Sequence, residues 1–195
     1  MGERGISPAS FATRGIDMTM KRIVAVYGCI AGVILVIGFE GSIATGLMGV
    51  DSSGMVLGYL IMLVALSMVF VGVKKYRDEQ LGGVIRFGTA LGLGAGIAAV
   101  ASGFYVAGWE AYLFATDYAF MPDYIAATIE AQRSAGASAA ELAALETELA
   151  GYVELYANPL TRMAVTLTEI APVALLAPVI SALLLRNPRF MPAQK

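Results

Sequence analysis

Three glutamates stand inside or beside long apolar stretches, and they are the residues of this chain best suited to chemistry. Glu40, Glu110 and Glu169 each lie among aliphatic or aromatic side chains. A carboxylate in such surroundings must pair, accept hydrogen bonds or keep its proton, and acids inside a membrane commonly bind protons or cations. The sequence has no histidine and a single cysteine, Cys29. We therefore expect no cofactor, no metal centre and no internal disulfide.

The elements that would position these acids are four apolar segments. Of all residues 58% are hydrophobic and 14% are charged, and the mean hydropathy is +0.73. A soluble domain carries roughly 25% charged residues. We expect an all-α integral membrane four-helix bundle within residues 20–186, flanked by a disordered polar tail at 1–19 and a short cytoplasmic tail at 187–195. Each span is near or above the ~20 residues that a crossing helix needs, and the spans are expected at about 23–50, 55–73, 84–114 and 163–185.

Basic residues indicate the orientation of the spans. Of the 13 Lys and Arg residues, all except Arg133 and Arg162 lie near the chain ends or around the connection between the second and third spans. The positive-inside rule then places both termini and this connection in the cytoplasm, in a bacterial inner membrane. Four basic residues should anchor the connection at the membrane surface: Lys74, Lys75, Arg77 and Arg86. The net charge of −2 gives no indication of nucleic-acid binding.

The segment between the third and fourth spans is expected to form an extracytoplasmic helical hairpin at about residues 121–157. Pro122 suits the first turn of one helix, and Ser138 with Glu141 forms a capping-box sequence that opens the second. The hairpin is acidic. Its carboxylates are expected to form a solvated face, with a surface that attracts a partner or a cation as the alternative.

Helix geometry places the three glutamates at similar depths. At ~1.5 Å per residue, Glu40 and Glu169 lie about 27 and 26 Å from the basic residues at the cytoplasmic ends of their helices, and Glu110 lies about 36 Å away. The hydrocarbon layer is ~30 Å thick, so all three fall near its outer boundary. We expect Glu110 to be a solvated interfacial carboxylate within an aromatic belt formed by Tyr105, Trp109 and Tyr112.

Glu169 lies deeper, and two interpretations remain open. If the bundle brings Glu40 next to it, the two acids would hold one proton or a cation between them. Pro172 would also free the carbonyl of Thr168 to join a cation site, although such prolines more often bend a packed helix. Alternatively, Glu169 accepts hydrogen bonds from Tyr or Trp and fixes the orientation of its helix.

Glycines mark faces for close helix packing. They recur at every fourth position in the third span, at Gly88, Gly92 and Gly96, and the first span offers Gly28 and Gly32. Such spacing lets helices approach closely, either within the bundle or across a homo-oligomer.

Several motifs in order resemble the bacterial family known as domain of unknown function 4199. They are "VGVKKYRDEQLGGVIRFGTA", "FYVAGWEAY", "GASAAEL", "YANPL" and "TEIAPV" followed by "SALLLR", and the likeness covers nearly everything from Met20 to Arg186. The resemblance implies a small integral membrane protein with four spans. The family has no established activity, so it implies no catalytic residue. Where a glycine is expected after "PV", this chain has Ala174.

Two functions remain open at this point. The first is a non-enzymatic membrane protein that acts by association with a second copy or a membrane partner, through its glycine faces and its acidic hairpin. The alternative is a small transporter or channel component in which Glu169, with Glu40 or Glu110, forms a proton or cation site. We expect no enzymatic activity, because the sequence shows no nucleophile–base spacing that would support one.

Overall fold

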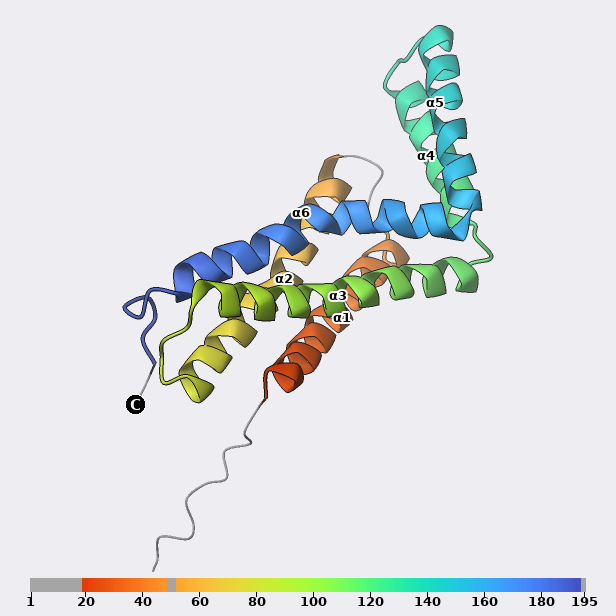
Figure 1. Ribbon diagram of the computed structural model, residues 1–195. Coiled ribbons are helices and arrows are strands. Elements are labelled where there is room, and N and C mark those ends of the chain that lie inside the picture. The colour runs from red at the N-terminus through yellow and green to blue at the C-terminus, as the bar shows by residue number, and fades with distance from the viewer. Residues whose placement is uncertain (1–18, 49–51, 194–195) are drawn as a thin grey trace, which may run out of the picture.

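The computed structural model describes residues 19–48 and 52–193, so the expected tail at 1–19 lies, apart from Thr19, outside the described residues. The described part forms six helices, α1 (Met20–Ala44), α2 (Ser52–Gln80), α3 (Phe87–Ala115), α4 (Phe120–Ser134), α5 (Ala139–Ala157) and α6 (Pro159–Leu185) (Figure 1). Four of these helices, α1, α2, α3 and α6, are long and apolar enough to cross a membrane.

Helix α1 stops at Ala44, well before the expected end at residue 50. Gly46 has a φ of +69°, which glycine adopts without the steric cost that a side chain would bring. The N–H of Leu47 donates to the carbonyl of Ser42 at 2.9 Å, the long hydrogen bond of a Schellman ending. The glycine therefore ends the helix although the apolar sequence continues beyond it.

Helix α2 is longer than the expected span of 55–73, because charged residues extend it by further turns. Two ion pairs join side chains four residues apart, Lys74–Asp78 at 2.5 Å and Lys75–Glu79 at 2.7 Å. Such pairs stabilise a helix. The helix then ends before two glycines with positive φ, Gly82 and Gly83.

The last span also begins earlier than expected, at Pro159 instead of residue 163. The side-chain oxygen of Asn158 accepts a 2.9 Å hydrogen bond from the N–H of Leu160, and proline is well suited to the first helical position. Arg162 consequently lies in the first turn of α6 and not in a loop. Helix α3 begins at Phe87 instead of residue 84, after Arg86 in an extended conformation.

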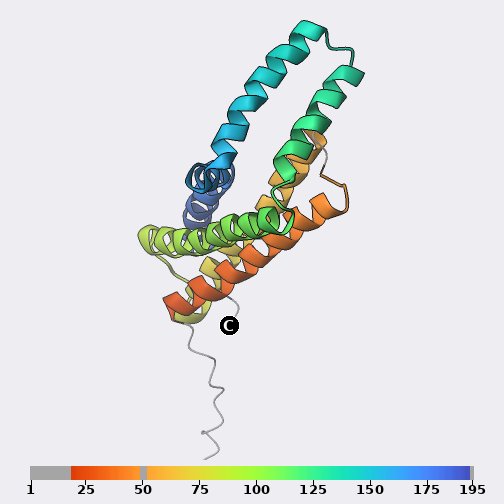
Figure 2. The same ribbon diagram turned by 90° about the vertical axis from the view of Figure 1, so that its right-hand side faces the viewer.

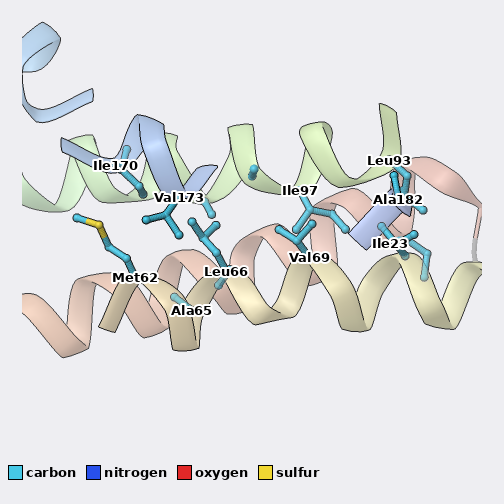
Figure 3. Close-up of a cluster of buried hydrophobic side chains, with 14 of the residues drawn as sticks. Ile23, Met62, Ala65, Leu66, Val69, Leu93, Ile97, Ile170, Val173 and Ala182 are labelled. Carbon is cyan, nitrogen blue, oxygen red and sulfur yellow. The ribbon is translucent and has the colours of Figure 1, made fainter. Parts of the chain in front are cut away.

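The four long helices form one bundle. Helix α1 packs against α2 and α3, and α6 packs against α2 and α3 from the other side, so α1 and α6 occupy opposite corners. Figure 3 shows the core between them, which is aliphatic along most of its length. We call the end of the bundle where α3 ends and α6 begins the hairpin end. The other end, with the α2–α3 connection and residues 187–193, is the basic end.

Helices α4 and α5 form an antiparallel hairpin that leaves the bundle at a steep angle to α3 and α6 (Figures 1 and 2). The predicted capping box is confirmed: the hydroxyl of Ser138 accepts the N–H of Glu141 at 3.3 Å, and the Glu141 carboxylate accepts the N–H of Ser138 at 2.7 Å. Across α4 and α5, all of whose residues are described, Leu149 is the one buried side chain, at 8% exposure. The hairpin therefore has almost no core of its own.

Candidate functional site

The hairpin end of the bundle holds a buried ion pair between α3 and α6. The Arg162 guanidinium donates from Nε to Glu110 Oε1 at 2.8 Å and from Nη2 to Glu110 Oε2 at 2.5 Å. Arg162 is only 4% exposed. Glu110, expected to be a solvated carboxylate, instead forms a bidentate ion pair with Arg162. This geometry makes arginine–carboxylate contacts strong and directional.

Arg162 also joins the hairpin to the bundle. Its Nη1 donates to the carbonyl of Tyr156 in the last turn of α5 at 2.7 Å, and its guanidinium lies 5.2 Å from the centre of the Tyr118 ring. Tyr118 reaches this position because it and Asp117 take positive φ angles in the turn after α3. One side chain thus connects α3, α5, α6 and the α3–α4 turn.

A second polar contact between α3 and α6 lies deeper in the bundle. The hydroxyl of Tyr105 donates to Glu169 Oε2 at 3.1 Å. Tyr105 is 5% exposed and points into the bundle, so it is not part of a membrane-facing aromatic belt. Neighbouring protein atoms cover much of the Glu169 carboxylate, whereas the residue as a whole is exposed. Glu169 therefore has one donor from the described chain and an open side.

Tyr156 lies near this contact. Burial, followed by the negative charge of Glu169, raises the pKa of the Tyr156 phenol to about 12. The phenol is therefore neutral at ordinary pH.

Glu40 does not pair with Glu169, because α1 and α6 stand at opposite corners with α3 between them. It lies on the other side of Tyr105, where Glu40 Oε1 is 3.2 Å from the position that a Cβ would take at Gly108. A small cavity of about 10 Å³ lies there, lined by Val36, Phe39, Glu40, Tyr105 and Trp109. That volume corresponds to about one water molecule.

The other two residues of the expected belt join an aromatic cluster that holds α4 against α3. The rings of Trp109 and Tyr112 stack with centres 5.5 Å apart, and Phe120 meets Trp109 edge-on at 4.7 Å. Tyr124 then stacks on Phe120 at 6.0 Å. Such pairs add about 0.5–1.5 kcal/mol each to the burial of the rings, so the cluster helps to fix the base of the hairpin.

Thr168, predicted to join a cation site, forms its hydrogen bond within its own helix. Its hydroxyl donates to the carbonyl of Val165 at 2.6 Å and its side chain is exposed. Within residues 19–48 and 52–193, no group of three or more His, Cys, Asp or Glu side chains is placed to hold a metal ion. Helix α6 continues through Pro172 and Pro178 and changes direction part-way along its length (Figure 1), as prolines commonly cause.

The glycines predicted to mark packing faces divide into two groups. A Cβ at Gly28 would lie 2.6 Å from Val100, and one at Gly32 would lie 2.4 Å from Phe104, so α1 and α3 touch closely there. Gly96 approaches Val24 of α1, with 3.1 Å from its virtual Cβ to Val24 Cγ2. Around the other two, Gly88 and Gly92, there is open space within this chain.

Of the four residues expected to anchor the basic end, Arg77 has a different environment. It is fully buried, and it donates to Asp78 at 2.6 Å and to the carbonyls of Phe190 and Met191 at 3.0 and 2.5 Å. Arg77 thus holds the segment 187–193 against α2, so this segment is not a free tail. The remaining three are partly or fully exposed: Lys74 and Lys75, in their ion pairs, and Arg86.

Sequence reasoning missed Arg162, Tyr118 and Tyr156 as members of the site. The available signal was the position of Arg162, one of two basic residues on the hairpin side, three residues after a proline that can open a helix. An arginine in the first turn of the last span lies at the same height as an acid near the end of the third.

Comparison with known proteins gives one match. The family model described as "Protein of unknown function (DUF4199)" matches residues 26–187. No curated protein and no solved structure matches the chain.

Proposed function

The chain belongs to the DUF4199 family of proteins of unknown function, and on that premise we propose that it is a non-enzymatic, multi-pass protein of the bacterial inner membrane that acts by association. Both termini and the basic end would face the cytoplasm, as the positive-inside rule favours, and the α4–α5 hairpin would lie outside. Its partners in this proposal are the lipid bilayer and another membrane protein.

One observation carries the proposal: the hairpin is held firmly at its base but is almost unburied along its length. Arg162 and the aromatic cluster fix the base, whereas Leu149 is the one buried residue of α4 and α5. Isolated helices of this length are marginal in water, and contact with a partner would stabilise them. The exposed apolar side chains available for that contact are Tyr124, Tyr152, Val153 and Leu155.

The hairpin end gives little support to catalysis. The cavity beside Glu40 and Tyr105 has room for about one water, whereas small-molecule sites usually occupy about 300–1,000 Å³. A larger hollow of about 480 Å³ lies at the far end of the hairpin, around Gly136 and Leu142, and is shallow and open. Neither place brings a nucleophile and a base together.

A proton site is the second candidate, because Tyr105 lies between two membrane carboxylates. It donates to Glu169 and lines the cavity that holds Glu40. The packing of the remainder of the bundle argues against transport. Towards the basic end the space between the helices is filled by fully buried aliphatic side chains, among them Leu66, Val69, Leu93 and Ile97. Within the described residues, this aliphatic packing disfavours a polar route for a proton.

The association proposal is tested by photo-cross-linking in living cells. A photoreactive amino acid at Tyr124 or Val153, both exposed, should give one adduct of defined mass, and the same amino acid at the buried Leu149 should give none. If no exposed hairpin position gives an adduct, and proteoliposomes show a proton or cation flux that Glu169→Gln abolishes, transport replaces association.

A further inference from the structure

The Glu169 side chain is exposed as a whole, and its partly covered carboxylate lies at a depth where lipid surrounds α6. At ~1.5 Å per residue it lies about 26 Å from Arg186, the residue that follows the last turn of α6. The hydrocarbon layer is ~30 Å thick, so the carboxylate falls inside it, near the hairpin end. Ionisable side chains at such depth almost always pair with other polar groups and avoid lipid, because exposure to lipid costs several kcal/mol.

The described chain leaves this carboxylate with unused acceptor capacity. Tyr105 supplies one hydrogen bond, and a carboxylate accepts about four. The basic residues at this end are already paired, Arg162 with Glu110 and Arg133 with Glu130. A cationic donor for the remaining acceptor sites would come from outside the described chain.

The face of α6 beside Glu169 suits the close approach of a helix. Exposed residues with small or compact side chains recur there at every fourth position: Ala164, Thr168 and Pro172. Because small residues allow helix backbones to approach, a partner helix on this face could bring its own side chain to the Glu169 carboxylate.

Charge decides what the partner carries. Between residues 116 and 158 the hairpin segment has seven acidic residues and one arginine. A second copy would bring another acidic hairpin and another Glu169, so like charges would meet at both levels. We propose that the α6 face formed by Ala164, Thr168, Glu169 and Pro172 binds a transmembrane helix of a different protein, one that carries a lysine or arginine near the hairpin end of the membrane. This inference rests on the proposed function, association, and specifies the partner.

A helix fits this site better than the amine of a lipid headgroup. The carboxylate lies about 4 Å inside the hydrocarbon boundary by the helix-rise estimate, and further inside if α6 tilts. A lipid amine would have to leave the headgroup layer to reach it, whereas the side chain of a helix already starts at that depth.

The test uses the full chain in phosphatidylcholine vesicles with two synthetic transmembrane peptides. One is an acceptor-labelled Leu/Ala helix with a single lysine near its hairpin-side end, and the other has leucine at that position. The protein carries a donor dye on Ser138→Cys in a Cys29→Ser background. Energy transfer should show the lysine peptide binding about 3- to 20-fold more tightly than the leucine peptide, the range that polar contacts between membrane helices give.

The preference for lysine should vanish in Glu169→Gln and persist in Glu40→Gln, a matched control whose carboxylate faces the cavity on the other side of Tyr105. Equal binding of the two peptides, or a preference that survives Glu169→Gln, overturns the proposal. Energy transfer between two copies of the chain that Glu169→Gln abolishes would assign the face to self-association and overturn it as well. Loss of the preference in phosphatidylethanolamine vesicles would assign the site to a lipid amine.

Cross-linking from the hairpin separates this inference from the proposed function. If the Val153 adduct forms in cells but the lysine peptide shows no preference, association stands and the α6 assignment fails. If neither is seen, association itself fails.

Discussion

Two buried arginines lie near opposite ends of the bundle, and they bind different kinds of partner. Arg77 at the basic end holds a terminal segment through two backbone carbonyls, and its acidic neighbour Asp78 keeps a second partner in Lys74. Arg162 at the hairpin end holds both oxygens of Glu110 and a carbonyl of α5. Among the described residues, Arg162 is the one cation that pairs with Glu110.

The comparison indicates that the hairpin end depends on one charged side chain, Arg162, whereas the basic end does not depend on Arg77 alone. Loss of Arg77 releases a peripheral segment and leaves its acid paired. Loss of Arg162 leaves a half-buried acid without a partner and removes the hydrogen bond between α6 and the last turn of α5. Breaking a buried pair from one side costs more than losing hydrogen bonds to neutral groups.

The largest effect is expected for Arg162→Met. The unpaired Glu110 should lower the free energy of unfolding by about 3–5 kcal/mol. Reversible unfolding in mixed detergent micelles measures this loss. Because the loss of stability comes from the unpaired Glu110 carboxylate, the double variant Arg162→Met with Glu110→Met should be more stable than Arg162→Met alone. An Arg162→Met protein as stable as Arg133→Met, in which an exposed pair is lost, would contradict the contrast.

Arg77→Met should have a smaller effect, about 1.5–3 kcal/mol, the range for hydrogen bonds to a charged group. The effect should also be local: residues 187–193 should become accessible to proteases while the hairpin keeps its protection from hydrogen exchange. Protection lost equally at both ends of the bundle would show that the two arginines are not independent.

The close packing of α1 against α3, between the two ends of the bundle, can be tested by adding a methyl group at a glycine. Gly32→Ala places a Cβ 2.4 Å from Phe104, so neighbouring atoms must shift, at a cost of about 1–3 kcal/mol. The matched change Gly92→Ala meets open space and should stabilise the helix by about 0.5–1 kcal/mol. Thermal unfolding of the two variants should therefore move in opposite directions, and a shift of the same sign would mean that the α1–α3 contact is looser than described.

The smallest effect is expected at the tip of the hairpin, farthest from either arginine. The hydrogen bond from the backbone N–H of Ser138 holds the pKa of Glu141 below its ordinary value of 4.5. A carboxyl with a lowered pKa stabilises the fold above its unfolded-state pKa and loses that contribution as pH falls through the folded-state value. Protection from hydrogen exchange in the first turn of α5, relative to the intrinsic exchange rate at each pH, should thus fall below about pH 4.5, and Glu141→Gln, which removes the titrating group, should remove this dependence.

The number and approximate place of the spans could be predicted, because a crossing helix has a minimum length and composition. The capping box was also readable, since Ser138 and Glu141 interact within one turn. The ends at Ala44 and Gln80 were not, because a positive-φ glycine and two ion pairs outweighed hydropathy.

The partners of the acids could not be predicted for a different reason. Spans that are apolar on all sides carry no periodicity that shows which face is buried. Whether Glu110 meets water or Arg162, and whether Glu169 meets Glu40 or Tyr105, depends on which helices are neighbours. That neighbourhood is decided by packing, such as the contact of Gly28 with Val100, and not by the acids themselves.

The hydrogen bonds of Arg77 have a consequence for biosynthesis. Its carbonyl partners come 113 and 114 residues later in the chain, so the ribosome has made four more helices before they exist. Until then the nascent α2 exposes a charged group whose final ligands are missing. The basic end can therefore close only late in synthesis, after Phe190 and Met191 have been made.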